Sequence, residues 1–431
     1  MPAPRTRGYH WPAMNRRQFL TGSATTAGLA ALGPLAETRS WFNTELARSV
    51  GIPTRADYSL AEGLTYFNHG SIGTVPRVVQ RAHAEYISTC ESNPWLYMWG
   101  GAWEEAREST RQAAATYVGC EAAEIAINRN TTDGFNLLAA GLPLQRGDEV
   151  VFSNLNHPGA SVCWEHCATA RGFTVRKMEI PFADVPEMTE AALVERHRAA
   201  VTKRTRVLIV PHLDNTLGIL TPVRAIAKAV RAVGVEFVFV DGAQTIGMLP
   251  VDIAALGVDA YCMSPHKWLQ APKGLGLLYL RKDLQKRLRP HTVTWGQRSW
   301  RGTVRMFEDY GTRDLSAVLA LGDAIIFQAA AGIANTAAMR KKLWDRIRAK
   351  VQADDRLIWR SPNSWELNGS LCAIEVRGKQ SAMLGARLWK EHKIVVRAFP
   401  AKGLNILRLS LNTMNTAAEI DAFFVAVNGL R

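Results

Sequence analysis

Short apolar runs alternate with amphipathic stretches through most of this chain, and this rhythm limits the possible folds more than any other feature. The runs are rich in Val, Ile, Leu and Phe, as strands buried on both faces of a sheet are. Seven runs read as strands, at 124–128, 148–153, 173–180, 206–213, 235–243, 260–264 and 274–280. Helical patterns lie between them, for example at 189–201 and 223–234. This order predicts an α/β fold with a large, mostly parallel sheet covered by helices.

The pattern changes near residue 315. Long helical stretches occupy 316–351, and a short α+β segment with the runs LCAIEV and NILRLSL follows them. A chain of 431 residues is long enough for about two to three domains. We therefore expect a large domain over 66–314 and a smaller C-terminal domain over 315–431, preceded by an N-terminal arm over 40–65.

Residues 1–39 look like a targeting segment. The stretch MNRRQFLTGSATTAGLAALGPLA starts at Met14, carries the pair Arg16 and Arg17, and continues into a mild apolar run. This layout resembles the twin-arginine export signal of bacteria. The run is too short and too weakly apolar for a stable membrane span, which needs about 20 strongly apolar residues. We expect a periplasmic or secreted protein exported by the twin-arginine machinery. An ordinary basic N-terminus is the alternative, and the cleavage site and the start (Met1 or Met14) stay open.

The chain is basic, with 52 Lys and Arg against 38 Asp and Glu and a formal net charge of +14. The excess is scattered, whereas nucleic-acid binding favours a basic stripe with interleaved aromatic residues. The nearest approach to such a stripe is KRLRPHTVTWGQRSWRGTVR, at 286–305. We therefore expect no nucleic-acid partner, and a basic surface suits acidic substrates instead. The six cysteines show no CxxC pair and no zinc spacing, so no metal site is predicted.

Polar side chains follow five of the predicted strands. In open α/β sheets, ligands bind at the carboxyl ends of the strands, so these side chains are expected to gather in one place. They are Asn130, Thr131 and Thr132, then His157, then Asp214 and Asn215, then Asp241 and Gln244, and finally Ser264, His266 and Lys267. Clusters after five strands are hard to explain by capping alone.

Three of these features together fit pyridoxal 5′-phosphate (PLP). An amine such as that of Lys267 can condense with an aldehyde as a Schiff base. The carboxylate of Asp241 lies on a predicted buried strand and needs a positive partner, which a protonated pyridine nitrogen supplies. The stretch NTTDGF resembles a helix start, where free N–H groups and the helix dipole favour phosphate. The aldehyde, ring nitrogen and phosphate of PLP need these three groups.

The chain resembles the class V, fold-type I PLP-dependent enzymes, in particular their isopenicillin N epimerase-like branch. The resemblance covers about residues 60 to 425. It rests on YFNHGSIGTVP, NRNTTDGFN, NHPGASVCWE, VDGAQ, SPHKW and LRLSLNTMNT, which occur in the order typical of the group. It implies a fold-type I architecture, PLP as cofactor, an amino-acid or peptide substrate, and a homodimer whose sites are each built from two chains.

The resemblance also implies residue roles. Lys267 binds the cofactor and later moves the Cα proton, Asp241 pairs with the pyridine nitrogen, and His157 stacks on the ring. Further cofactor contacts are implied for Gln244 and Asn215 at the ring hydroxyl, and at the phosphate for Thr131, Thr132, Ser264, His266 and, from a second subunit, Gly311 and Thr312. Asp214 is an alternative to Asn215.

On the substrate side, Arg408 matches the arginine that clamps the α-carboxylate, a bidentate task suited to guanidinium. Asn68 and His69 are expected near the substrate. Simpler interpretations remain open for several residues: Gln244 as a helix cap, His157 as a loop histidine, and Arg408 as a surface strand residue.

The reaction stays open at this level, because the pocket selects among the reactions that PLP supports. The resemblance favours an epimerase or aminotransferase acting at the α-carbon of an amino acid or peptide-borne amino acid, with His69 as the candidate second acid for epimerisation. The alternatives are a C–S lyase and an enzyme that modifies siderophore side chains of the pyoverdine type. Cysteine desulfurase activity is disfavoured, because no cysteine follows Cys372. The complete residue set also disfavours a non-catalytic binding protein.

Overall fold

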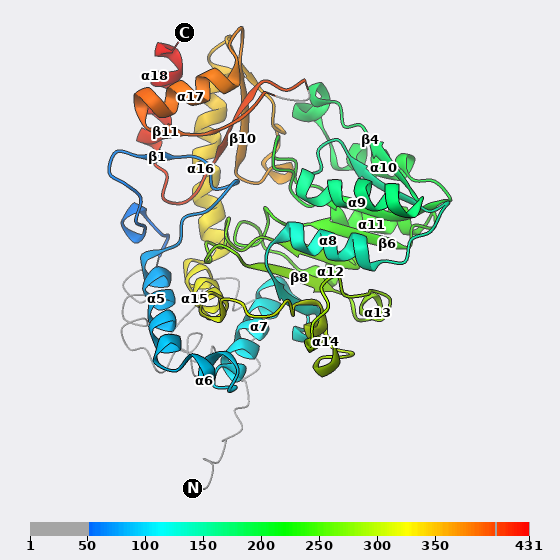
Figure 1. Ribbon diagram of the computed structural model, residues 1–431. Helices are drawn as coiled ribbons and strands as arrows, with labels where there is room; N and C mark the ends of the chain where they lie inside the picture. Colours follow the sequence, from blue (N-terminus) through cyan, green and yellow to red (C-terminus); the bar gives the residue numbers. More distant parts are fainter. Residues whose placement is uncertain (1–50, 401–402, 431) are drawn as a thin grey trace.

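The computed structural model describes residues 51–400 and 403–430 (Figure 1). The predicted export segment at 1–39, and the part of the N-terminal arm before residue 51, lie outside the described residues. Two sheets organise the rest of the chain, and the long helix α16 (Ile333–Gln352) runs between them.

The larger sheet has seven strands in the order β2-β8-β7-β6-β5-β3-β4. Its strands are β2 (Ile125–Asn128), β3 (Glu149–Ser153), β4 (Thr174–Met178), β5 (Thr205–Pro211), β6 (Phe237–Asp241), β7 (Ala260–Met263) and β8 (Gly276–Leu280). β8 runs antiparallel to β2 and β7, and the other neighbouring pairs are parallel. All seven predicted strands are present, and the predicted fold class is confirmed.

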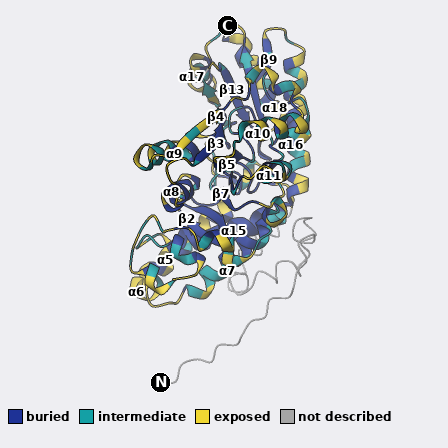
Figure 2. Cartoon of the chain, turned by 90° about the vertical axis from the view of Figure 1, so that its right-hand side faces the viewer, coloured by how far each residue is buried: buried dark blue, intermediate teal, exposed yellow. Residues whose placement is uncertain are grey.

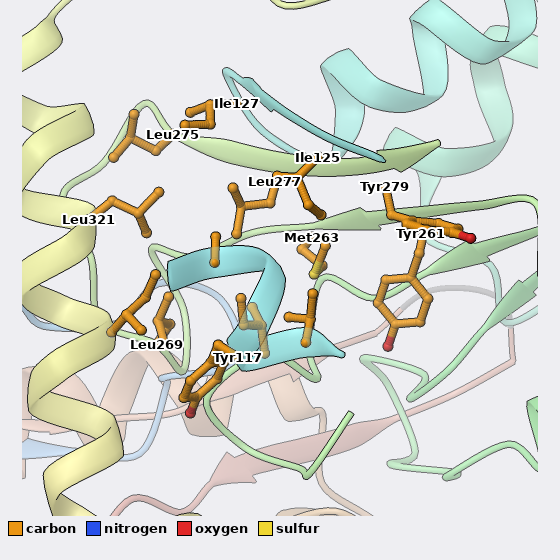
Figure 3. Close-up of a cluster of buried hydrophobic side chains, with 14 of the residues drawn as sticks. Tyr117, Ile125, Ile127, Tyr261, Met263, Leu269, Leu275, Leu277, Tyr279 and Leu321 are labelled. Atoms are coloured by element: carbon orange, nitrogen blue, oxygen red, sulfur yellow. The ribbon is translucent and has the colours of Figure 1, made fainter. Parts of the chain in front are cut away.

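Helices cover both faces of this sheet, because successive strand side chains point to opposite faces. In β6, Val238 and Val240 pack in one apolar cluster, while Phe237 and Phe239 pack in another. The first cluster (Figure 3) also receives α5 (Arg77–Ser92), α7 (Glu104–Val118) and α11 (Val223–Arg231). The second is covered by α8 (Thr131–Gly141) and α9 (Pro158–Arg171). Figure 2 shows the strands as buried and the outer helix faces as exposed.

The smaller unit is built on an antiparallel sheet of four strands in the order β12-β13-β10-β9. These are β9 (Leu357–Trp359), β10 (Leu371–Val376), β12 (Arg397–Phe399) and β13 (Ile406–Ser410), and they pack with α16, α17 (Ser381–His392) and α18 (Ala417–Gly429). A short parallel pair, β1 (Thr65–Tyr66) with β11 (Ile394–Val395), joins the N-terminal stretch to this unit. The remaining helices are α6 (Pro94–Met98), α10 (Glu190–Ala200), α12 (Ile253–Leu256), α13 (Lys282–Gln285), α14 (Gly296–Ser299) and α15 (Leu315–Ala331).

One expectation needs correction. The run at 173–180 is not buried on both faces, because β4 lies at the edge of the sheet and three of its five residues are exposed. The long helical stretches predicted over 316–351 are α15 and α16, which meet at Gly332 with a bend of 70°. Gly332 has φ of 73°, a left-handed conformation that favours glycine.

The packing of α15 bears on the domain limits. Its side chains lie in the same apolar cluster as α5 and α7, on the large sheet, whereas α16 packs in the small unit. The predicted domain boundaries stay predictions. This packing favours placing the boundary between the large and the C-terminal domain at Gly332 rather than at residue 315. Within the described residues no single helix is long and apolar enough to cross a membrane; only the bent pair α15 and α16 passes that test together, by length and composition.

Candidate active site

A cavity of about 460 Å³ opens where the carboxyl ends of the large-sheet strands face the small unit. The large sheet contributes His157 after β3, Asn215 after β5 and Lys267 after β7, and the small unit contributes Arg408 of β13. Three of the five groups that were predicted to gather at the strand ends therefore line one cavity.

Lys267 is the lysine of this cavity. Burial lowers the pKa of its amine from 10.5 to about 8, while the nearby charge of Asp241 acts in the opposite direction. An amine with a lowered pKa is neutral in a substantial fraction of molecules near pH 8, and the neutral amine is the nucleophile. The position can therefore hold an aldehyde covalently.

Asp241 ends β6 and is 6% exposed. Its Oδ1 accepts a hydrogen bond of 2.9 Å from the Ala243 N–H. Among the described residues, no Lys, Arg or His lies within ion-pair distance of this carboxylate. A buried carboxylate without a cationic partner is costly. It fits the place of the protonated ring nitrogen of PLP, with Lys267 close enough to feel its charge.

The start of α8 has the features of a phosphate site. The Asn130 side chain caps the helix by accepting from the Asp133 N–H at 2.8 Å, and the first N–H groups of a helix have no partner within it. The hydroxyls of Thr131 and Ser264 lie 2.7 Å apart, so α8 and the end of β7 meet here. Thr132 lies against Gly159, where an added Cβ would be 2.4 Å from its hydroxyl oxygen.

His266 is close to these groups but is held differently. Burial, then the charge of Lys267, lowers the pKa of its imidazole to about 4, so the ring is neutral at pH 7. Its Nδ1 is buried without a hydrogen-bond partner in the described structure. This unpaired nitrogen and the pair of hydroxyls nearby fit a polar group such as phosphate.

His157 and Gln244 occupy positions that fit the predicted ring contacts. His157 begins α9, and its Nδ1 accepts from the Gly159 N–H at 3.0 Å. Gln244 is 2% exposed; it donates to the Gly70 carbonyl at 2.8 Å and accepts from the Trp268 indole at 2.8 Å. No helix follows β6 directly, so the interpretation of Gln244 as a helix cap is wrong, and one amide N–H is left for a cofactor hydroxyl.

Arg408 is 1% exposed, so the interpretation of it as a surface strand residue is also wrong. Its guanidinium donates to the Asn215 carbonyl at 2.6 Å, to Asn68 Oδ1 at 2.8 Å and to Ser71 Oγ at 3.0 Å. Burial, then the charge of Arg397, lowers its pKa to about 9. These bonds hold the guanidinium in place at the cavity wall, as a carboxylate clamp requires.

The loop after β5 separates the roles of Asp214 and Asn215. The Asp214 carboxylate accepts from the N–H groups of Thr216, Leu217 and Ile219 at 2.6–2.8 Å and does not line the cavity. Asp214 therefore shapes the loop, and Asn215 is the residue that reaches the cavity.

His69 is not placed near a substrate. Its ring is fully buried and packs edge-on against Tyr66, with a centroid distance of 5.0 Å, and it does not line the cavity. Burial lowers its pKa to about 3. His69 begins a turn closed by hydrogen bonds from the Ser71 and Ile72 N–H groups to the Asn68 carbonyl, and its ring lies in the interior while the Asn68 side chain accepts from Arg408. The expectation that His69 is the second acid is corrected on this ground.

Gly311 and Thr312 lie away from the Lys267 cavity. They line a second cavity of about 380 Å³ together with Trp99, Trp295 and Trp300. The aromatic stretch ESNPWLYMWGGAW, at 91–103, thus lies beside them. Within one chain, neither residue contributes to the site that holds Lys267.

The cavity also contains residues that the sequence reasoning did not single out, among them Phe182, Arg397 and Phe399. The alternation in VVRAF was the available signal for the last two, since it places Arg397 and Phe399 on the same face of a strand. None of the six cysteines, all within the described residues, lines this cavity.

The fold and this cavity define a fold-type I enzyme whose residues fit PLP. Comparison with known proteins agrees: the family model described as Aminotransferase class-V matches residues 65–423. The chain belongs to the class V aminotransferase family of PLP-dependent enzymes, as predicted.

Curated relatives include two isopenicillin N epimerases. The one from Streptomyces clavuligerus is 31% identical over 74% of this chain and 83% of its own length. The one from Amycolatopsis lactamdurans is 30% identical over 87% of this chain and 97% of its own. A probable cysteine desulfurase of Pseudomonas aeruginosa is 29% identical over 88% of this chain and 98% of its own length.

Solved structures share the fold. A complex of the cystine C–S lyase C-DES with cysteine persulfide superposes with a TM-score of 0.77 at 22% identity, covering 85% of this chain and 98% of that one. A C-DES mutant with glycine covalently linked to its PLP cofactor gives a TM-score of 0.79 at 22% identity, covering 87% and 99%.

Proposed function

We propose that this enzyme moves a proton at the α-carbon of an amino acid, free or at the end of a peptide, as an epimerase does. The observation that supports this is that Lys267 and Arg408 line one cavity, with the buried carboxylate of Asp241 close enough to Lys267 to act on its charge. The similarity to two isopenicillin N epimerases favours epimerisation over transamination.

Each residue of the site has a separate role in this reaction. PLP bound here withdraws electrons from the α-carbon of an attached amino acid and so acidifies its proton. Asp241 keeps the ring nitrogen protonated, and Arg408 fixes the α-carboxylate and with it the direction of the Cα–H bond. Lys267, once its amine is free, takes the proton. Because its pKa is about 8, it can both accept and return a proton near neutral pH.

Return of the proton to the opposite face needs a second group. Of the described side chains that line the cavity, His157 is the one besides Lys267 that exchanges protons near neutral pH. Burial lowers the pKa of His157 below the ordinary 6.5, with Asp241 acting in the opposite direction, so at pH 7 a minor fraction of the rings carries the proton that this step requires. We assign His157 in place of His69 as the candidate for this step.

The test uses the holoenzyme in D2O. Borohydride reduction followed by peptide mass analysis should find the cofactor on Lys267, and NMR should show exchange of the Cα proton with formation of the D-isomer. Release of a 2-oxo acid with gain of an amino group by the cofactor would indicate transamination, and release of sulfide or persulfide from cysteine or cystine would indicate a lyase. Failure of every amino acid and short peptide to exchange, with the cofactor on Lys267, would refute the proposal.

We also propose export by the twin-arginine route, which carries folded proteins and so suits an enzyme that binds PLP in the cytoplasm. The support is the sequence pattern around Arg16 and Arg17. Cell fractionation of the wild type and of the variant with both residues changed to Lys tests this. Periplasmic or secreted wild type and cytoplasmic variant are expected, and cytoplasmic wild type refutes it.

We infer a homodimer in which Thr312 contributes to the partner's phosphate site. The support is the position of Thr312 outside its own chain's cavity, beside the exposed Trp99 and Trp295. Sedimentation should give twice the mass of the chain, and Thr312→Ala should weaken PLP binding. A wild-type protein that sediments as a monomer would contradict this inference. So would a Thr312→Ala variant that binds PLP as tightly as the wild type.

A further inference from the structure

The Lys267 cavity carries more positive charge than the proposed reaction uses. Among the described residues, three cationic side chains line it: Lys267, Arg397 and Arg408. No Asp or Glu among the described residues lines it. Lys267 serves the cofactor and Arg408 the α-carboxylate, so one guanidinium is left without an assigned partner.

Arg397 and Arg408 are direct neighbours across two strands. They are register partners in the antiparallel pair β12–β13. Directly opposed residues have Cα atoms about 4.5–5.5 Å apart, and like charges in this position destabilise a sheet. The charge of Arg397 adds to burial in lowering the pKa of Arg408. An anion bound at both guanidinium groups would relieve this repulsion.

The two arginines differ in how they are held. Arg408 is buried and fixed by three hydrogen bonds. Arg397 is exposed, and no carboxylate of the described residues lies within ion-pair distance of it. Both guanidinium carbons lie 5.5 Å from the centre of the same ring, that of Phe399. A short molecule with two acidic groups can therefore bind both guanidinium groups, one with each acidic group.

Apolar side chains share the cavity with these charged groups. Leu155, Phe182, Phe399 and Leu404 line the same cavity. Methylene groups fit against such side chains, and a second carboxylate at the end of a short methylene chain would reach beyond them. The cavity thus combines two guanidinium groups with an apolar wall, which matches a dicarboxylic amino acid better than a neutral one.

We propose that Arg397 binds a second carboxylate of the substrate, so that this enzyme acts on acidic amino acids with a short aliphatic side chain. The proposal rests on the proposed function, because it takes Arg408 as the clamp for the α-carboxylate. Arg397 then determines specificity: a charge-assisted hydrogen bond forms with an acidic side chain and is missing with its neutral amide.

The experiment compares matched substrates and matched variants of the holoenzyme. L-glutamate and L-2-aminoadipate are each tested against L-glutamine and L-norleucine, with Cα proton exchange in D2O and the absorbance change of the cofactor as readouts. Arg397→Gln removes the charge at the cavity, and Arg397→Lys keeps it. Lys390→Gln is the control, since it removes one positive charge from an exposed position of α17 outside the cavity.

The wild type should prefer the acidic substrates by roughly 10- to 100-fold in kcat/KM, mostly through KM, which is the effect of losing a hydrogen bond to a charged group. Arg397→Gln should lose this preference through a fall in kcat/KM on the acidic substrates, Arg397→Lys should keep part of it, and Lys390→Gln should keep all of it. Equal use of glutamate and glutamine by the wild type, or an unchanged preference in Arg397→Gln, overturns the inference and leaves the proposed function intact.

A binding measurement tests the inference without requiring turnover. Calorimetry with glutarate and with pentanoate, which have equal chain length and differ by one carboxylate, should show tighter binding of glutarate to the wild type and equal binding to Arg397→Gln. Equal binding to the wild type refutes the role of Arg397. Lack of cofactor on Lys267, in contrast, refutes the proposed function.

Discussion

Replacing Gly73 with alanine tests whether the contact between the N-terminal loop and the lysine segment positions the site. An ideal Cβ at Gly73 would lie 1.9 Å from the carbonyl oxygen of Lys267 and 3.0 Å from that of His266. Both are backbone atoms, so no side-chain rotation can relieve the contact. The Gly73 N–H also donates to the His266 carbonyl at 2.8 Å.

The size of the effect follows from these distances. Ordinary contact requires about 3.5 Å, so the two segments must separate by roughly 1.5 Å. Overpacking of this kind costs about 1–3 kcal/mol, and loss of the hydrogen bond adds about 1 kcal/mol. The loop carries Asn68 and Ser71, which hold Arg408, so the separation shifts Lys267 relative to the clamp. A misplacement of about 1 Å can lower a rate by roughly 100-fold.

The assay measures Cα proton exchange in D2O with the best substrate, PLP affinity, and the urea midpoint of unfolding. Gly429→Ala is the matched control, because a Cβ there meets nothing within 4 Å. We expect Gly73→Ala to lose about 100-fold in exchange rate, and Gly429→Ala to lose nothing. A folded Gly73→Ala enzyme that exchanges within about twofold of the wild type would refute the positioning argument.

Three further outcomes are expected. Arg408→Lys should raise KM by roughly 100-fold, since an ammonium cannot reproduce the bidentate fork, and an unchanged KM would remove Arg408 from carboxylate binding. Covalent uptake of PLP by the apoenzyme should speed up as pH rises through about 8, because the neutral Lys267 amine is the reacting form; a midpoint near 10.5 would contradict the effect of burial. Glu308→Gln should lower the free energy of unfolding by about 3 kcal/mol, since the buried Arg111 guanidinium, 2.6 Å from Glu308, then keeps only the exposed Glu108 as a charge partner. Arg111 and its neighbours lower the pKa of Glu308 from 4.5 to about 2, so this stabilisation is present above pH 4.5 and is lost as pH falls towards 2; a urea midpoint that stays constant over this range would contradict it.

Sequence patterns predicted the large sheet well because both of its faces are buried. Continuous apolar runs mark such strands, and β5, β6 and β7 lie within two residues of the predicted limits. The edge position of β4 could not be predicted, since it depends on strand order. The position of the break between α15 and α16, at Gly332, could not be predicted, because a single glycine is tolerated in a helical pattern.

Site residues that directly follow a strand were predicted from the sequence. Site residues whose position depends on the pairing of strands were missed. Lys267, His157 and Asn215 meet because parallel strands end at one edge. His69 was misplaced because its direction depends on the alignment of Asn68 with Ser410. Arg397 was overlooked because its closeness to Arg408 arises from the β12–β13 register, which no local pattern encodes.

The bonds of Arg408 have a consequence for anyone who wishes to redesign this enzyme. The same guanidinium that faces the cavity ties together the small sheet, the loop after β5 and the segment around Asn68. Recognition of the ligand and docking of the two halves thus share one side chain. An engineer who replaces Arg408 to admit amines without an acid group must first introduce other contacts between these segments. Otherwise the two units will lose their docking, and no new selectivity can be observed.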